Sequence, residues 1–147
     1  GRLIGNLALP ELLREKMREA PMVVVEQSLE ERIDVVIEDY IVDLGRRFAL
    51  MFGDAGARLH SEKLQQDLDK ISRRLGGLRC QQVSELMHMA FERQWQTGDV
   101  SPHRHWVGIL LEKYYDPMYE YQLSKRAGKR LFTGDRQAVL AWAQQGA

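Results

Sequence analysis

The sequence contains little that marks a catalytic centre. It has one cysteine, Cys80, so no disulfide forms within the chain, and a lone thiol fits a reducing compartment such as the cytoplasm. No apolar run approaches the roughly 18 residues of a membrane-spanning helix, and no signal-peptide pattern opens the chain. The phosphate-loop motif G-x-x-x-x-G-K-[ST] is absent, as is any ligand spacing typical of a metal site. We therefore predict neither catalytic residues nor metal ligands in this chain.

An excess of charge of one sign is also missing. The 147 residues include 21 basic and 21 acidic side chains, which gives a formal net charge of zero. Global charge therefore gives no argument for binding to nucleic acid, and any such surface must be a local patch. With 44% hydrophobic residues, the chain is suited to one or two compact units.

The sequence shows one clear strand and no second clear strand to pair with it. Met22–Val25 is an apolar, mostly β-branched run, the pattern of a strand in a parallel sheet. A helix ends before it at Pro21, and Ser28 with Glu31 predicts a capping box for the next helix. A lone strand needs a sheet to join, yet Leu131–Thr133 is at most a short extended piece. An unpaired strand would allow a homodimer through Met22–Val25.

Beyond Leu44 the pattern is helical. A seam of apolar residues repeats at spacings of four, three and four, which is typical of helices that pack along one stripe. The seam residues are Leu64, Leu68, Ile71 and Leu75. Gly76-Gly77 ends this helix, and a second helix follows, which predicts an α-hairpin. Asp116-Pro117 predicts a break or a fresh helix start, and Asp135 can cap a last helix.

Two segments resemble a known family. They read LIGNLALPELLREKMREAPMVVVEQSLEERIDVVIEDY from Leu3 to Tyr40 and LLEKYYDPMYEYQLSKR from Leu110 to Arg126. With them the chain resembles the C-terminal part of tRNA 2-selenouridine synthase, a family that joins a rhodanese-like domain to a P-loop domain and continues into a helical region. The resemblance implies a mainly α fold. Residues 1–45 would be a helix–strand–helix remnant that ends a P-loop-type α/β domain, and residues 46–147 a helical, bundle-like domain.

The resemblance also implies a function. The parent enzyme would be a transferase that converts 2-thiouridine at the tRNA wobble position to 2-selenouridine, by way of S-geranyl-2-thiouridine. Its substrates would be selenophosphate and geranyl diphosphate. The implied partners of this chain are tRNA and the rhodanese and P-loop domains, which would lie outside it. Alone, the chain would be inert and would aid tRNA binding and cleft formation. The alternatives are a structural or dimerisation appendage without RNA contact, and a small helical regulator.

The candidates for tRNA contact lie near the C-terminus. They are Lys125, Arg126, Lys129 and Arg130, together with Tyr115 and Tyr119 of the family's YYDP-x-Y pattern. Four cations within six residues are hard to bury, which favours contact with phosphates. Tyrosine rings stack on splayed RNA bases, although packing at a helix junction would explain them equally well.

Two arginines are candidates for a phosphate site or cleft. Arg32 lies in the first turn of the helix after the strand, where the family pattern has an arginine, and a guanidinium binds phosphate bidentately. The alternative is a surface ion pair with Asp34 or Glu31. Arg2, just before Ile4, would line the same cleft. For three apolar residues, Phe48, Met51 and Phe52, two roles remain open: they line a binding slot for a geranyl chain, or they pack in the core.

Overall fold

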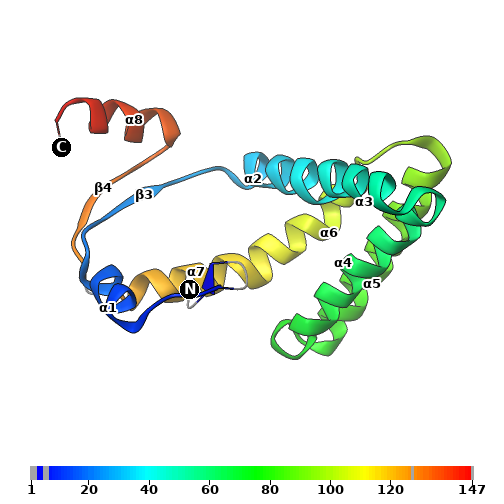
Figure 1. Cartoon of the computed structure of the whole chain (residues 1–147), viewed down its shortest axis with the longest axis horizontal. Helices are drawn as coiled ribbons and strands as arrows, with labels where there is room; N and C mark the ends of the chain where they lie inside the picture. Colours follow the sequence, from blue (N-terminus) through cyan, green and yellow to red (C-terminus); the bar gives the residue numbers. More distant parts are fainter. Residues whose placement is uncertain (1–2, 5–6, 127, 147) are drawn as a thin grey trace. The chain divides into compact units, whose positions relative to one another are not determined.

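The computed structural model describes residues 3–4, 7–126 and 128–146, and it is mainly helical, as predicted (Figure 1). Arg2 lies outside the described residues, so its role stays a prediction. The chain forms two compact units: Gly1–Gln27 with Tyr119–Ala147, and Ser28–Met118. We name the first the α/β unit and the second the helical unit. Their boundaries fall at 27/28 and 118/119, whereas the sequence suggests 45/46. The assignment of residues 1–45 to a P-loop-type domain stays a prediction.

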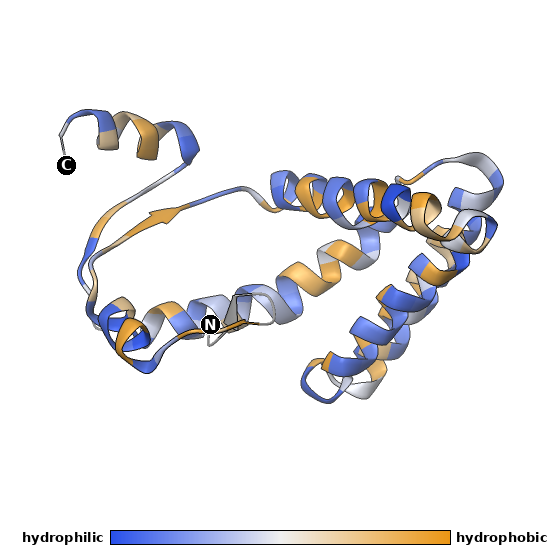
Figure 2. Ribbon diagram, viewed as in Figure 1, coloured by the Kyte–Doolittle hydropathy of each residue, from blue (hydrophilic) through white to orange (hydrophobic). Residues whose placement is uncertain are grey.

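The α/β unit is built around two parallel strands. Its elements are β1 (Leu3–Ile4), β2 (Leu7–Ala8), α1 (Glu11–Glu19), β3 (Met22–Val25), β4 (Arg130–Gly134) and α8 (Arg136–Gln144). β1 pairs with β2 in antiparallel fashion, and β3 pairs with β4 in parallel, with Met22 opposite Arg130 and Val25 opposite Gly134. The register shifts once, between Met22 and Val23. Figure 2 shows β3 as a continuously hydrophobic strand.

The pairing of β3 with β4 corrects the prediction that β3 lacks a partner. A parallel partner cannot follow through a tight turn, because the chain must first cross back over the sheet. Here the residues between the two strands comprise the whole helical unit, so the partner strand lies far along the sequence. The sequence of β4, RLFTG, gives only a weak strand signal because it starts with a cation and ends with glycine. The prediction of a homodimer through Met22–Val25 assumed an unpaired strand, and the pairing with β4 removes that assumption.

The helical unit consists of three helical stretches. The first is continuous from α2 (Leu29–Val36) through the π-helical segment η1 (Ile37–Asp43) to α3 (Leu44–Phe52). After the 3-10 turn η2 (Gly53–Ala55), α4 (Gly56–Leu75) and α5 (Gly77–Thr97) form the predicted α-hairpin. The third stretch runs from α6 (His103–Leu110) through η3 (Leu111–Tyr115) into the start of α7 (Asp116–Ser124), whose residues from Tyr119 on belong to the α/β unit. Figure 1 shows α4 and α5 side by side.

The core lies entirely in the helical unit. Every buried hydrophobic residue in the described part of the chain belongs to it, and the predicted seam supplies three of them. The core residues are Ile33, Ile37, Ile41, Leu64, Leu68, Leu75, Val83, Met87, Ala90, Phe91, Trp106, Val107 and Leu110. Gly76 has a φ of 92°, a conformation that favours glycine, and it separates the two hairpin helices. Packing of this core, rather than helix propensity, holds the unit together.

The helix does not break at Asp116-Pro117. Proline lacks the N–H that an α-helix uses to bond four residues back, so an interior proline usually kinks the helix. The π-helical segment η3 ends at Tyr115, two residues before Pro117, and the Asp116 N–H donates to the carbonyl of Leu111, five residues back. The wider turn changes the hydrogen-bond register just before the missing donor, and α7 starts afresh at Asp116 within one continuous helical stretch.

None of the helices in the described part of the chain is both long and apolar enough to span a membrane.

Candidate nucleic-acid interface

The neutral chain divides into two units of opposite net charge. The α/β unit contains nine Lys and Arg residues and six Asp and Glu residues, a formal net charge of +3. The helical unit contains twelve basic and fifteen acidic residues, a net charge of −3. A net positive charge favours association with a polyanion, and a net negative charge opposes it. This asymmetry is invisible in the summed charge of the sequence.

The predicted basic cluster belongs to the positive unit, although the sequence suggests a place in the helical domain. Lys125, Arg126, Lys129 and Arg130 are all exposed. Among the residues that the structure describes, no carboxylate lies within ion-pair distance of any of the four. Their charge is consequently not neutralised by neighbours, which is the condition for contact with phosphates.

Backbone contacts fix the segment that carries this cluster. α7 ends at Ser124, and the chain then passes the end of α1 so closely that a Cβ on Gly128 would overlap the carbonyl oxygen of Ala20. The Met22 N–H donates to the carbonyl of Lys129 at 2.9 Å, and Arg130 begins β4. The cations thus lie on a short connection anchored at the start of the sheet.

Two exposed tyrosines precede the cluster in the α/β unit. Tyr119 is 53% exposed and Tyr121 is 64% exposed, and the Lys125 ammonium lies 5.3 Å from the centre of the Tyr121 ring. The sequence reasoning missed Tyr121, although its spacing of four residues from Lys125 on a helix was a usable signal. Tyr115 belongs to the helical unit instead, half-buried, with its ring 5.0 Å from that of Tyr114. The structure therefore separates Tyr115 from Tyr119 by unit.

Arg32 forms a two-point ion pair with Asp116. Its Nη1 donates to Oδ1 of Asp116, and its Nη2 donates to Oδ2 at 2.8 Å. The hydrogen bond from Arg32 lowers the pKa of Asp116 below its ordinary value, although partial burial opposes the shift. The pair joins the two motifs that resemble the family, and the sequence reasoning missed it because Asp116 is so distant. A phosphate role for Arg32 stays a prediction and would require it to leave Asp116.

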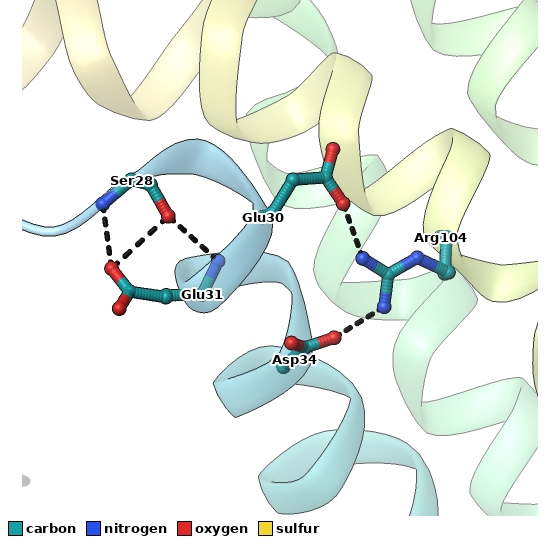
Figure 3. Close-up of polar contacts among 5 residues, drawn as sticks. All are labelled: Ser28, Glu30, Glu31, Asp34 and Arg104. Atoms are coloured by element: carbon teal, nitrogen blue, oxygen red, sulfur yellow. Dashed lines mark hydrogen bonds and ion pairs between the residues drawn. The ribbon is translucent and has the colours of Figure 1, made fainter.

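A second arginine makes the reciprocal contact between the same helical stretches. Arg104 of α6 donates to the carboxylates of Glu30 and Asp34, both on α2 (Figure 3). Figure 3 also shows the predicted capping box at the start of α2, in which the Ser28 hydroxyl accepts from the Glu31 N–H at 3.2 Å. Charges of α2 thus pair with α6 and with the start of α7, which fixes α2 within its unit.

Two buried histidines of the helical unit, His60 and His103, both pack against the ring of Phe91. The Trp106 indole N–H donates to Nδ1 of His103 at 2.9 Å, which leaves the ring proton on Nε2 to be donated to Gln94. Burial lowers the pKa of His103 to about 4. His60 donates from Nε2 to the Tyr40 carbonyl in η1 at 2.7 Å, and burial lowers its pKa as well. Both rings are neutral packing elements.

No chemical centre is evident elsewhere in the described residues. No group of three or more His, Cys, Asp and Glu side chains in those ranges is arranged to hold a metal ion. Burial raises the pKa of the half-buried Cys80 thiol, which disfavours the reactive thiolate. The surface that remains as a candidate site is the basic segment of the α/β unit with its exposed tyrosines.

The chain is similar to known proteins over nearly its whole length. The family model described as "tRNA 2-selenouridine synthase AAA domain" matches residues 1–147. The chain is 40% identical over 144 residues to a tRNA 2-selenouridine synthase of Pseudomonas fluorescens (strain Pf0-1), covering 98% of this chain and 39% of that protein. It is 41% identical over 145 residues to the enzyme of that name from Pseudomonas syringae pv. syringae (strain B728a), covering 98% and 40%. The chain spans about 40% of the length of these curated relatives. No solved structure matches.

Proposed function

The chain belongs to the family of the tRNA 2-selenouridine synthase AAA domain, and on that premise we propose that it serves in tRNA modification by binding tRNA phosphates through its α/β unit. The observation that carries the proposal is the exposed cluster Lys125–Arg130, which no carboxylate neutralises among the described residues. It lies in the unit of net charge +3 and beside exposed tyrosines. Cations for phosphates and rings for unstacked bases are the features that looped RNA requires.

The reaction we propose for the whole protein is the conversion of 2-thiouridine to 2-selenouridine at the wobble position. It would pass through S-geranyl-2-thiouridine and use selenophosphate and geranyl diphosphate. Within this chain, Phe48, Met51 and Phe52 remain the candidates for contact with a geranyl chain. Phe48 packs against Phe52 at 5.5 Å and against His60 at 5.7 Å, while Met51 and Phe52 are exposed. Slower oxidation of Met51 in the presence of geranyl diphosphate would support the contact, and an unchanged oxidation rate would oppose it.

Catalysis itself would come from rhodanese and P-loop domains that are partners of this chain. The sheet of the α/β unit is an argument for such partners, because the stability of a two-stranded sheet is marginal unless further elements cover it. Val25 of β3 and Leu131 of β4 are each about half exposed, whereas strands of a parallel sheet are ordinarily buried on both faces. We therefore expect residues 1–147 alone to leave thiouridine unconverted. Selenouridine formation by the purified chain would contradict this.

The test of the proposed function is tRNA binding across a salt series. The charge-reversal variant Lys125→Glu/Arg126→Glu/Lys129→Glu/Arg130→Glu should bind more weakly. Its salt dependence should also be shallower, by roughly 0.7 to 0.9 of a slope unit for each phosphate that the variant no longer neutralises. A matched control reverses four exposed arginines of the helical unit, Arg47, Arg73, Arg74 and Arg79.

The control variant should bind tRNA as tightly as the wild type. Equal affinity and equal slope for the wild type and the first variant would overturn the assignment of tRNA contact to this cluster. Complete absence of binding would favour the alternative, a structural or dimerisation appendage. In that case the concentration dependence of the mass from light scattering would separate dimers from monomers.

A further inference from the structure

A groove in the α/β unit brings α1 beside the basic segment. It has a volume of about 520 Å³ and is lined by Leu12, Glu15, Lys16, Arg18, Glu19 and Lys125. Leu12, Glu15, Lys16 and Glu19 are spaced as i, i+3, i+4 and i+7, so they form one face of α1. Lys125 reaches the groove because the chain after α7 passes directly over the end of α1, where Gly128 meets Ala20. The sequence reasoning assigned no role to any residue of α1.

The groove offers charges of both signs, and several are free to bind a ligand. Among the described residues, neither Lys16 nor Lys125 has a carboxylate within ion-pair distance, and Glu15 and Glu19 form no ion pair either. Arg18 makes only a long contact of 3.7 Å with Glu11. Unpaired cations next to unpaired carboxylates suit a ligand that carries both an anionic group and hydrogen-bond donors.

The aromatic ring of Tyr121 lies beside Lys125, one of the cations that line this groove. The Lys125 ammonium lies over one face of the Tyr121 ring, and 64% of Tyr121 is exposed. A base can stack on the opposite face of the ring, while the ammonium on the first face meets a neighbouring phosphate. The ring, the cations and the carboxylates are chemically suited to the base, the phosphate and the sugar of one nucleotide.

We propose that this groove is a ribonucleotide subsite of the RNA surface. Tyr121 stacks on a base, Lys16 and Lys125 contact its flanking phosphates, and Glu15 or Glu19 accepts a hydrogen bond from the ribose 2′-hydroxyl. The proposal rests on the proposed function, and it adds Lys16, Tyr121 and the two glutamates to that surface. A free phosphate ion is a poorer ligand, because the two carboxylates of the lining repel it. The 2′-hydroxyl is the group that distinguishes RNA from DNA at a single site.

The test compares short single-stranded RNA and DNA oligonucleotides of one uridine- or thymidine-containing sequence by fluorescence anisotropy, using residues 1–147. Tyr121→Ala should weaken RNA binding roughly tenfold, the size expected for loss of a base stack. Lys16→Ala should weaken binding to both nucleic acids and lower the salt slope by about one contact. Glu15→Ala/Glu19→Ala, which removes both acceptors, should bring the affinities for RNA and DNA together. The matched controls are Tyr40→Ala and Arg73→Ala in the helical unit, which should change nothing.

The outcomes separate this inference from the proposed function. If reversal of Lys125–Arg130 abolishes tRNA binding while Tyr121→Ala and Lys16→Ala leave oligonucleotide binding intact, the subsite is wrong and the tRNA surface stands. Equal affinity of the wild type for RNA and DNA would overturn the 2′-hydroxyl contact. If the wild type binds neither tRNA nor oligonucleotide, both proposals fail. Far-UV circular dichroism of each variant establishes that it is folded.

Discussion

At the scale of single residues, Arg32 has a structural role that its place in the sequence does not indicate, because it forms an ion pair with Asp116. Both side chains are less than one-third exposed, and the carboxylate accepts from both terminal nitrogens of the guanidinium. The Arg32 Nε is buried and has no partner in the described structure, so the guanidinium is desolvated on that side. Removing one member leaves the other partly buried without its counter-charge, which costs more than the loss of a surface pair.

The first prediction is a coupling between these two residues. In a double-mutant cycle, Arg32→Ala and Asp116→Ala should show a coupling free energy of roughly 1–3 kcal/mol, as expected for a charge-assisted two-point contact. The measurement is urea unfolding of the wild type, both single variants and the double variant. A control cycle with the exposed pair Arg58 and Glu62 should give less than about 0.5 kcal/mol. Coupling near zero between Arg32 and Asp116 would leave the arginine available for an anion.

The second prediction concerns His103 and the pH dependence of stability. Its side chain is fully buried, and its pKa in the folded protein is about 4, below the ordinary value of 6.5. Between these values the unfolded chain binds a proton that the folded chain does not. The stabilising contribution of the neutral ring is therefore complete above pH 6.5 and is lost as the pH falls toward 4. The depressed pKa of His60 acts in the same direction.

The measurement for His103 is the free energy of unfolding at several pH values from about 7.5 to about 4. This interval covers both the ordinary pKa of histidine and the lowered pKa of His103. The wild type should lose on the order of 2–3 kcal/mol more than His103→Gln over this range, because glutamine does not titrate. Parallel pH profiles for the two proteins would show that His103 has the same pKa in the folded and unfolded states and would contradict the prediction. His105→Gln, at an exposed position, is the matched control and should follow the wild type.

At the scale of elements, the close approach of α3 and α4 depends on a glycine. A Cβ placed on Gly56 would lie 2.6 Å from the Phe48 carbonyl oxygen and 2.8 Å from the Ala49 backbone. Backbone atoms cannot move aside as the end of a flexible side chain can, so the two helices would have to separate. Gly77, at the start of α5, has no atom within 4 Å of the corresponding position and serves as a control.

The third prediction contrasts these two glycines. Alanine raises helix propensity at both positions by about 1 kcal/mol. Gly77→Ala should therefore leave stability unchanged or raise it. Gly56→Ala should instead destabilise the protein by roughly 1–3 kcal/mol, because the overlap with α3 outweighs the gain in propensity. Thermal unfolding followed by circular dichroism measures both. Equal melting temperatures for the two variants would show that α4 is not held against α3 as described.

Local signals predicted the elements, whereas distant partners escaped prediction. The capping box at Ser28, the strand Met22–Val25 and the hairpin at Gly76-Gly77 each depend on residues a few positions apart, and all three are present. The pairing of β3 with β4 and of Arg32 with Asp116 joins residues that are more than 80 positions apart in the sequence, as the separation of 84 between Arg32 and Asp116 shows. A single sequence has no local pattern that encodes such contacts. The same limit hid the groove, because Lys16 and Lys125 meet only after folding.

At the scale of the whole molecule, stability and charge are divided between the two units. All the buried hydrophobic residues in the described ranges lie between Ile33 and Leu110, within the helical unit. The α/β unit has the positive charge and the candidate RNA surface but none of those core residues. A unit that buries so little apolar surface within itself gains little free energy from folding alone. It should therefore depend on neighbouring elements to order its sheet.

The fourth prediction is that residues 28–118 fold as an independent unit. They contain the whole core, the Arg32–Asp116 pair and the capping box, so their urea midpoint should match that of the helical transition in the full chain. Leu68→Ala should destabilise both proteins by roughly 2–5 kcal/mol, because Leu68 is only 3% exposed. Leu131→Ala, at a position 48% exposed in β4, should leave the transition of the full chain unchanged.

The isolated unit should also bind tRNA more weakly than the full chain at every salt concentration, since it keeps the net charge of −3 and lacks Lys125–Arg130. Hydrogen exchange on the full chain gives an independent measure. The slowest amides should lie in α4, α5 and α6, and those of β3 and β4 should exchange much faster. If residues 28–118 were unfolded in isolation, or if β3 and β4 were the best protected elements, the helical core would not be the source of the chain's stability. The α/β unit would then fold cooperatively with it despite its exposed apolar residues.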